Sequence, residues 1–202
     1  MGRNSSSRGY ETQAVEPGQM SDISRHLLPT SDILPHLVHE HQLGFENRVF
    51  HAAYVMRALL HEGRGSLPMA AKEQVETLAD ELARYILFAD EAKLPAKGVQ
   101  GDPAFISAFY RNKKPAAGAG GASLKDFDLR SRIFRYRCSY MLYTDSWQML
   151  PRELRERVYY KMAEGLRETN SNPVYSHLSP DEKRAIRTIL KETLTGLPPW
   201  WR

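Results

Sequence analysis

The sequence has one cysteine and no long apolar run, and these absences restrict what the protein can be. Cys138 alone excludes an internal disulfide, a thiolate zinc cluster and a C-x-x-C-H haem attachment motif. No stretch approaches the ~18–20 apolar residues of a membrane span, which predicts a soluble protein. No apolar core follows Arg3, so we expect no signal peptide in this chain. No segment alternates with the period of a strand, so no sheet is expected.

Excess charge is also scarce. The chain has 28 Lys and Arg against 24 Asp and Glu, and this net charge of +4 is too small to indicate nucleic-acid binding by itself. Four arginines are interleaved with aromatic residues late in the chain. On a helix, however, Arg130 and Arg137 face away from Arg132 and Arg135, and on a strand the four arginines again divide between opposite faces. No single basic face results, and no nucleic-acid partner is expected.

What the sequence does contain is helical periodicity. Apolar residues recur every three or four positions in five segments, at about Asp32–His61, Pro68–Ala89, Ala104–Tyr110, Pro151–Leu166 and Pro180–Gly196. We therefore predict an all-α fold, an irregular bundle of about five to six helices. A chain of 202 residues suits one domain with a sizeable core.

Two segments lack this periodicity. Residues 1–20 are rich in Ser, Gly and Arg, and burial cannot offset the entropy of ordering them. We expect a disordered tail or linker there, followed by a single helical domain at 21–202. Residues 112–124 are rich in Ala and Gly, with no side chain expected to anchor them, which predicts a mobile loop. Its glycines match no phosphate-binding spacing.

The segment Asp32–His61 holds five of the seven histidines. At about 100° per residue, its apolar residues form one stripe that includes His41 and Arg48. A buried polar group without a hydrogen-bond partner costs roughly 1–3 kcal/mol, so these two need partners. Acids paired with arginines in the dense stretch Asp126–Trp147 would supply them. The resulting hypothesis is a buried polar network of His41, Arg48, Asp126, Asp128, Arg130 and Arg132.

Metal binding is a weaker hypothesis for this helix. His36 and Glu40 share a face and His39 flanks them, but the H-E-x-x-H pattern is absent. Two ligands under-coordinate zinc, so His36, His39 and Glu40 are weak candidates and we assign no metal. His41 is either a core histidine or, alternatively, an axial ligand to non-covalent haem. Cys138, in a densely packed run, is interpreted as structural rather than nucleophilic.

Several stretches together carry a resemblance to a protein family. They are Ser31–Ile33, Glu40–Gln42 with Asn47, Arg84–Ala92, Gly101–Phe105, Ser123–Tyr143, His177–Ser179 and Gly196–Trp200. They resemble the C-terminal helical region of exported bacterial proteins of uncharacterised activity, whose upstream part carries c-type haem motifs. The resemblance covers most of the chain after residue 30. Where it leads us to expect a histidine before Asn47, this sequence has Glu46, which argues against an iron ligand there.

The resemblance implies a haem-bearing protein or domain as partner, an exported or periplasmic location, and a chain that is the tail of a longer protein. The leading functional hypothesis is a non-catalytic accessory or interaction domain associated with a c-type cytochrome-like or redox partner. The alternative is a haem- or metal-binding redox enzyme domain that uses His41 and its neighbours. No cofactor is assigned, and haem is the one candidate.

Overall fold

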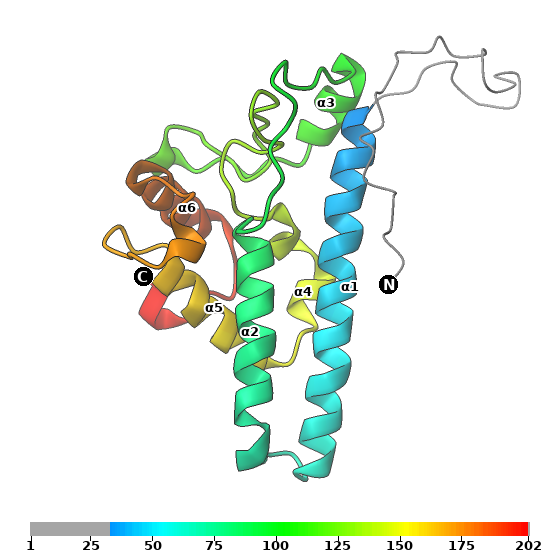
Figure 1. The fold of residues 1–202 in the computed structure, drawn as a ribbon, viewed down its shortest axis with the longest axis vertical. Helices are drawn as coiled ribbons and strands as arrows, with labels where there is room; N and C mark the ends of the chain where they lie inside the picture. Colours follow the sequence, from blue (N-terminus) through cyan, green and yellow to red (C-terminus); the bar gives the residue numbers. More distant parts are fainter. Residues whose placement is uncertain (1–32, 202) are drawn as a thin grey trace, which may run out of the picture. The chain divides into compact units, whose positions relative to one another are not determined.

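The computed structural model describes residues 33–201, and this part of the chain is an irregular all-α bundle, as predicted (Figure 1). It contains six α-helices: α1 (Ile33–Glu62), α2 (Lys72–Ile86), α3 (Pro103–Tyr110), α4 (Asp145–Gln148), α5 (Arg152–Gly165) and α6 (Pro180–Thr193). Within these residues, extended pairing is limited to two isolated bridges, Ala116 with Ala122 and Phe127 with Phe134. The predicted tail at 1–20 lies outside the described residues.

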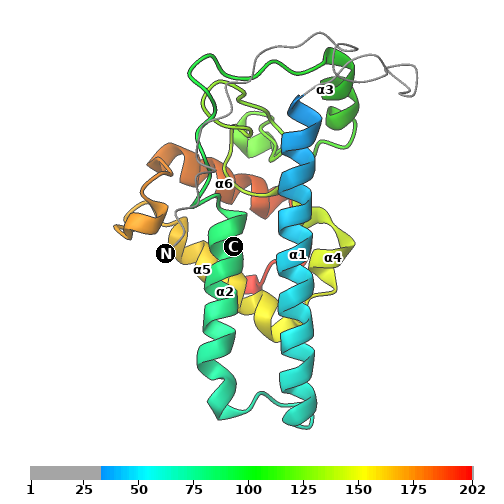
Figure 2. The ribbon, with the colours of Figure 1, turned by 45° about the vertical axis from the view of Figure 1, so that its right-hand side comes forward.

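Helices α1 and α2 lie side by side and antiparallel in both views (Figures 1 and 2). A glycine allows the short connection between them. Gly65 adopts φ 92°, and its N–H donates to the Leu60 carbonyl at 2.8 Å, which ends α1. α2 begins later than expected, since Met69–Ala71 form a separate 3-10 turn. It also ends earlier, where Phe88 turns to φ 55°. Beyond this left-handed residue the helix does not continue, and the Phe88 ring lies 4.7 Å from that of His41 of α1.

Helix α5 packs against α2 and contributes several residues to the core (Figure 2). Leu154, Val158 and Met162 of α5 are fully buried at the helical period predicted for them. At the edge of this interface, the Lys161 ammonium lies 3.0 Å from a carboxylate oxygen of Glu76 and 3.0 Å from one of Asp80. Partly exposed pairs of this kind contribute little each, so the apolar contact dominates the packing.

The stretch from 123 to 139 is neither the helix nor the strand considered from the sequence. Phe127 and Phe134 form an isolated bridge that closes an irregular turn, and Leu129 in this turn takes φ 58°. The sequence predicts that Leu129, Ile133, Tyr136 and Met141 pack inward. Met141 is buried, and the other three are partly buried against the core. Phe134 and Cys138 are fully buried although they were not among the expected residues, because this segment lacks a regular period.

The glycine-rich segment 112–124 has anchors that its composition did not predict. Ala116 and Ala122 are buried and joined by a 2.9 Å bond from the Ala116 N–H to the Ala122 carbonyl. The Gly118 N–H donates to Glu192 Oε1 of α6 at 3.0 Å, and a Cβ at Gly118 would lie only 2.4 Å from that oxygen. The expectation that nothing anchors this segment is therefore wrong, while its mobility remains a prediction.

The C-terminal tryptophans behave differently from each other. Trp201 is 6% exposed, and its ring centroid lies 6.0 Å from that of Tyr159. Tyr159 in turn accepts a 2.9 Å hydrogen bond from the fully buried Trp147 Nε1. Trp200 is 52% exposed. The large apolar area of a tryptophan favours burial of both, but only Trp201 folds back onto the core.

This difference gives a matched pair of substitutions. Trp201→Ala should lower the free energy of unfolding by about 3 kcal/mol or more, because it removes a buried ring from the core. Trp200→Ala should cost less than about 1 kcal/mol, since half of its surface is already in water. Urea unfolding followed by circular dichroism measures both values. Equal losses would contradict the packing described for the C-terminus.

Candidate functional site

His41 is buried, as the sequence predicts, and its imidazole lies among aromatic rings. Its ring stacks on Phe88 at 4.7 Å and on Tyr85 at 5.5 Å between centroids, and two tilted rings, Phe134 and Tyr140, lie within 6.0 Å. Burial lowers the pKa of His41 to about 4, so its imidazole is neutral at pH 7. A neutral, enclosed imidazole suits a structural role.

The hydrogen-bond partner of His41 is a serine rather than the expected carboxylate or carbonyl. His41 Nε2 lies 2.8 Å from the hydroxyl oxygen of Ser139, which is completely buried. That oxygen also accepts from the Met141 N–H at 3.2 Å, and the Ser139 N–H donates to the Ile86 carbonyl at 2.8 Å. Ser139 therefore connects α1, the end of α2 and the segment that follows residue 139.

Close approach of α1 and α2 beside His41 depends on a glycine. The Tyr85 hydroxyl donates to the His41 carbonyl at 3.0 Å, and a Cβ at Gly44 would lie 2.2 Å from that hydroxyl. Any larger residue at 44 would push the Tyr85 ring away from α1. This contact fixes one wall of the site.

Arg48 is exposed, so its predicted burial is wrong. Val49 occupies the core position instead, because the centre of the buried stripe runs through Phe45, Val49 and Met56. Arg48 extends sideways, with its guanidinium 4.1 Å from the Tyr85 ring centroid and Nη1 donating to the Gly44 carbonyl at 2.9 Å. A long side chain at the edge of a stripe can cover apolar surface and still reach water.

The two aspartates of the predicted network have local partners rather than His41. Asp126 pairs with Lys113 and accepts from the Ser123 N–H at 2.9 Å. Asp128 accepts from both the N–H and the hydroxyl of Ser131, each at 2.9 Å. Both carboxylates stabilise turns within their own segment, so the proposed link from these acids to α1 is not formed.

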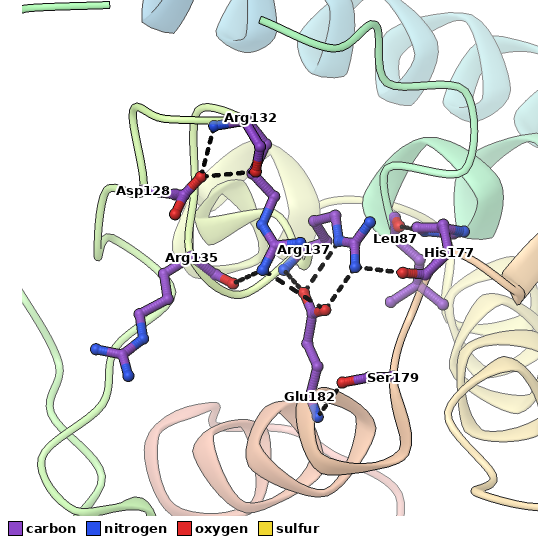
Figure 3. A network of polar contacts seen from close by, with 9 residues as sticks. Leu87, Asp128, Arg132, Arg135, Arg137, His177, Ser179 and Glu182 are labelled. Atoms are coloured by element: carbon purple, nitrogen blue, oxygen red, sulfur yellow. Dashed lines mark hydrogen bonds and ion pairs between the residues drawn. The ribbon is translucent and has the colours of Figure 1, made fainter. Parts of the chain in front are cut away.

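Arg130 is exposed, and Arg132 joins a different network, which is centred on Glu182 of α6 (Figure 3). The Glu182 side chain is 7% exposed and lies 2.6 Å from Arg137 Nη2. Its Oε1 also accepts from the Arg137 backbone N–H at 2.9 Å and from Arg137 Nε at 3.1 Å. Arg132 Nη2 is more distant, at 3.8 Å. This is the principal buried ion pair of the described chain.

Sequence reasoning missed Ser139, Arg137 and Glu182 as partners. Glu182 carries a signal, because Ser179 and Glu182 form the S-x-x-E pattern that begins α6, and Ser179 Oγ accepts from the Glu182 N–H at 3.2 Å. In a capping box the glutamate carboxylate would accept a hydrogen bond from the Ser179 N–H, but here it binds Arg137 instead. Ser139 had no comparable signal.

The weak metal candidates stay apart from any third ligand. His36, His39 and Glu40 are exposed on α1, and residues 33–201 contain no group of three His, Cys, Asp or Glu side chains placed to hold a metal ion. Glu46, which stands where a histidine was expected, accepts from the Ser146 hydroxyl at 2.9 Å. Cys138 is fully buried, and burial raises the pKa of its thiol well above the ordinary value, which opposes nucleophilic chemistry.

An open pocket of about 740 Å³ borders His41. It lies between α1 and α2 and is closed on another side by residues 89–92 and Ile133. Its walls combine the rings of Tyr85 and Phe88 with several charged side chains.

None of the helices in the described part has both the length and the hydropathy of a membrane span.

The lowered pKa of His41 predicts a pH dependence of stability. Because its folded pKa is about 4 and its ordinary value 6.5, the unfolded state binds the proton more tightly. Stability contributed by neutral His41 is complete above pH 6.5 and is lost as the pH falls towards 4. The loss should amount to about 3 kcal/mol.

The measurement compares the free energy of unfolding of wild type and His41→Leu from pH 7 to pH 4. Carboxylate titration is common to both proteins, so the wild type should lose about 3 kcal/mol more than the variant over this range. Parallel pH profiles would show that His41 is not held neutral.

The Glu182–Arg137 pair gives a second stability prediction. Glu182→Met should cost roughly 3–5 kcal/mol, because it leaves a buried guanidinium unpaired, whereas adding Arg137→Met should restore part of the loss. Glu168→Met is the control, since Glu168 pairs with Arg184 at the surface and should cost at most about 1 kcal/mol. A double-mutant cycle in urea measures the coupling, and additive effects would contradict it.

The chain was also compared with protein families, with curated proteins and with solved structures, and none of the three comparisons gives a match. The interpretation of the site therefore depends on its own geometry and chemistry.

Proposed function

We propose that this chain is a non-catalytic interaction domain that associates with a haem-bearing redox protein or domain through the outer face of α1. The observation that carries the proposal is an exposed apolar stripe on that face. Leu43, Phe50 and Tyr54 are 49%, 47% and 71% exposed. They are seven and four residues apart, so they fall within about 40° of one another around the helix, opposite the buried face.

Large apolar side chains that cluster on one face of a helix are seldom left exposed to water without a binding partner. α1 buries eight residues on its other face, including His41, so its fold does not depend on the stripe. Aromatic side chains clustered at a surface are typical of protein interaction sites. Polar residues such as His36 and Asn47 border the stripe, as at the rim of an interface.

The interior chemistry supports a role without catalysis. His41 is neutral and held by Ser139, and Cys138 is a buried thiol with a raised pKa. Neither group is placed as a nucleophile with an adjacent base. The haem-bearing class of partner follows from the resemblance of residues 31–200 to the helical region of exported proteins with c-type haem motifs.

The proposal is tested with the full chain and a small monohaem c-type cytochrome, with binding followed by sedimentation at the Soret wavelength. The variant Leu43→Ser/Phe50→Ser/Tyr54→Ser should bind at least ~30-fold more weakly, which corresponds to the loss of one ~2 kcal/mol hot spot. The control Met69→Ser/Met149→Ser/Tyr160→Ser changes three other exposed apolar residues and should bind like wild type.

Wild-type chain that fails to bind the cytochrome, or equal weakening in both variants, would contradict the proposal. A hemin titration separates the alternative in which His41 is a haem ligand. That alternative requires a shifted Soret band that His41→Leu abolishes, while the melting temperature of the cofactor-free protein stays near wild type.

A further inference from the structure

We propose that the pocket between α1 and α2 binds an organic cation, a guanidinium or ammonium group carried on an apolar stem. This site is separate from the exposed stripe of α1 and does not depend on the function proposed above. Its volume of about 740 Å³ is within the range of small-molecule sites.

The walls suit a flat or extended apolar group with positive charge. Tyr85 and Phe88 present aromatic rings, and Leu37 and Ile133 add aliphatic surface. Aromatic faces attract cations, most strongly where the cation is partly desolvated. Arg48 shows this attraction within the structure itself, since its guanidinium lies 4.1 Å from the Tyr85 centroid at the pocket edge.

The charges favour a cation over an anion. Four carboxylates and two arginines line the pocket, so four negative charges face two positive ones. Arg84 Nη2 lies 2.9 and 3.0 Å from the two oxygens of Asp90, and Arg48 Nη1 donates to the Gly44 carbonyl. His41 is neutral, so it adds no positive charge. The lining therefore has an excess of two carboxylates over arginines, which favours an incoming cation.

Three carboxylates of the lining remain available. Glu40, Glu81 and Glu91 form no ion pair among residues 33–201. Glu91 is the most buried of the three, and one of its oxygens accepts from the Ile133 N–H at 3.3 Å. Its second oxygen accepts no hydrogen bond within residues 33–201, and Arg132 and Arg137 act on the carboxylate electrostatically. Burial raises the pKa of Glu91, so a bound cation would stabilise its charged form.

This chemistry occurs in two sources, the basic side chain of a protein and a free alkylamine or alkylguanidine. Both place a charged head on a stem of a few methylene groups, which matches carboxylates beside aromatic walls.

The probe is butylguanidinium, and its matched neutral control is butylurea, which has the same stem and a similar planar head. Titration of the full chain is followed by NMR shifts of the Tyr85 and Phe88 rings. Butylguanidinium should bind at least ~10-fold more tightly than butylurea, since a charge-assisted hydrogen bond is lost with the neutral head.

Glu91→Gln should weaken butylguanidinium binding by at least ~10-fold and leave butylurea unchanged. Glutamine keeps an oxygen for the Ile133 N–H, so the fold is retained. Glu73→Gln, an exposed acid in the first turn of α2 outside the pocket, should bind both probes like wild type. Tighter binding of the peptide Ac-Gly-Arg-Gly-NH₂ than of butylguanidinium identifies a protein side chain as the source; tighter binding of butylguanidinium identifies a free amine or guanidine.

Equal affinity for butylguanidinium and butylurea would overturn the proposal, and this comparison needs no variant. Preference for pentanoate over both probes would overturn it as well, because it would show an anion site. Equal effects of Glu91→Gln and Glu73→Gln on butylguanidinium affinity would show that the Glu91 carboxylate does not bind the cation, and would overturn the proposal too.

Discussion

The buried carboxylate of Glu182 is the constraint on which the second half of the structure depends. It joins the first turn of α6 to both the backbone and the guanidinium of Arg137 (Figure 3). Arg137 also donates to the His177 carbonyl, and His177 Nε2 lies 2.8 Å from the Leu87 carbonyl at the end of α2. A buried ion pair adds little net stability over apolar residues, but breaking it is costly, so its main effect is to fix position.

The segment held by this ion pair also contacts the buried face of α1. Ser139 lies two residues beyond Arg137, and its hydroxyl holds the imidazole of His41. His41 in turn forms part of the pocket wall with Tyr85 and Phe88. The ion pair also lies close to the pocket, since Arg137 and Glu182 both act electrostatically on Glu91 of the lining.

The two proposed interaction surfaces use different faces of α1. The outer stripe of Leu43, Phe50 and Tyr54 faces away from the core, whereas Glu40, Gly44 and Arg48 border the pocket on the side of α2. A long helix with one buried face has room for both. Neither surface needs a reactive side chain, and the buried His41 and Cys138 both lie in the interior.

The sequence by itself determined the helices, because their causes are local. Apolar residues recur at the helical period in α1, α2 and α5, and Ser179 begins α6 through the side-chain cap that its sequence pattern predicts. It also placed His41 in the core. It did not locate Arg48, since one position around the helix decides whether a long side chain is buried or lies at the edge.

Only the tertiary structure decided the partners: Ser139 lies 98 residues from His41, and Glu182 lies 45 residues from Arg137. Residues 123–139 have no regular period, and a hydrogen bond between distant residues leaves no mark on the local pattern of either.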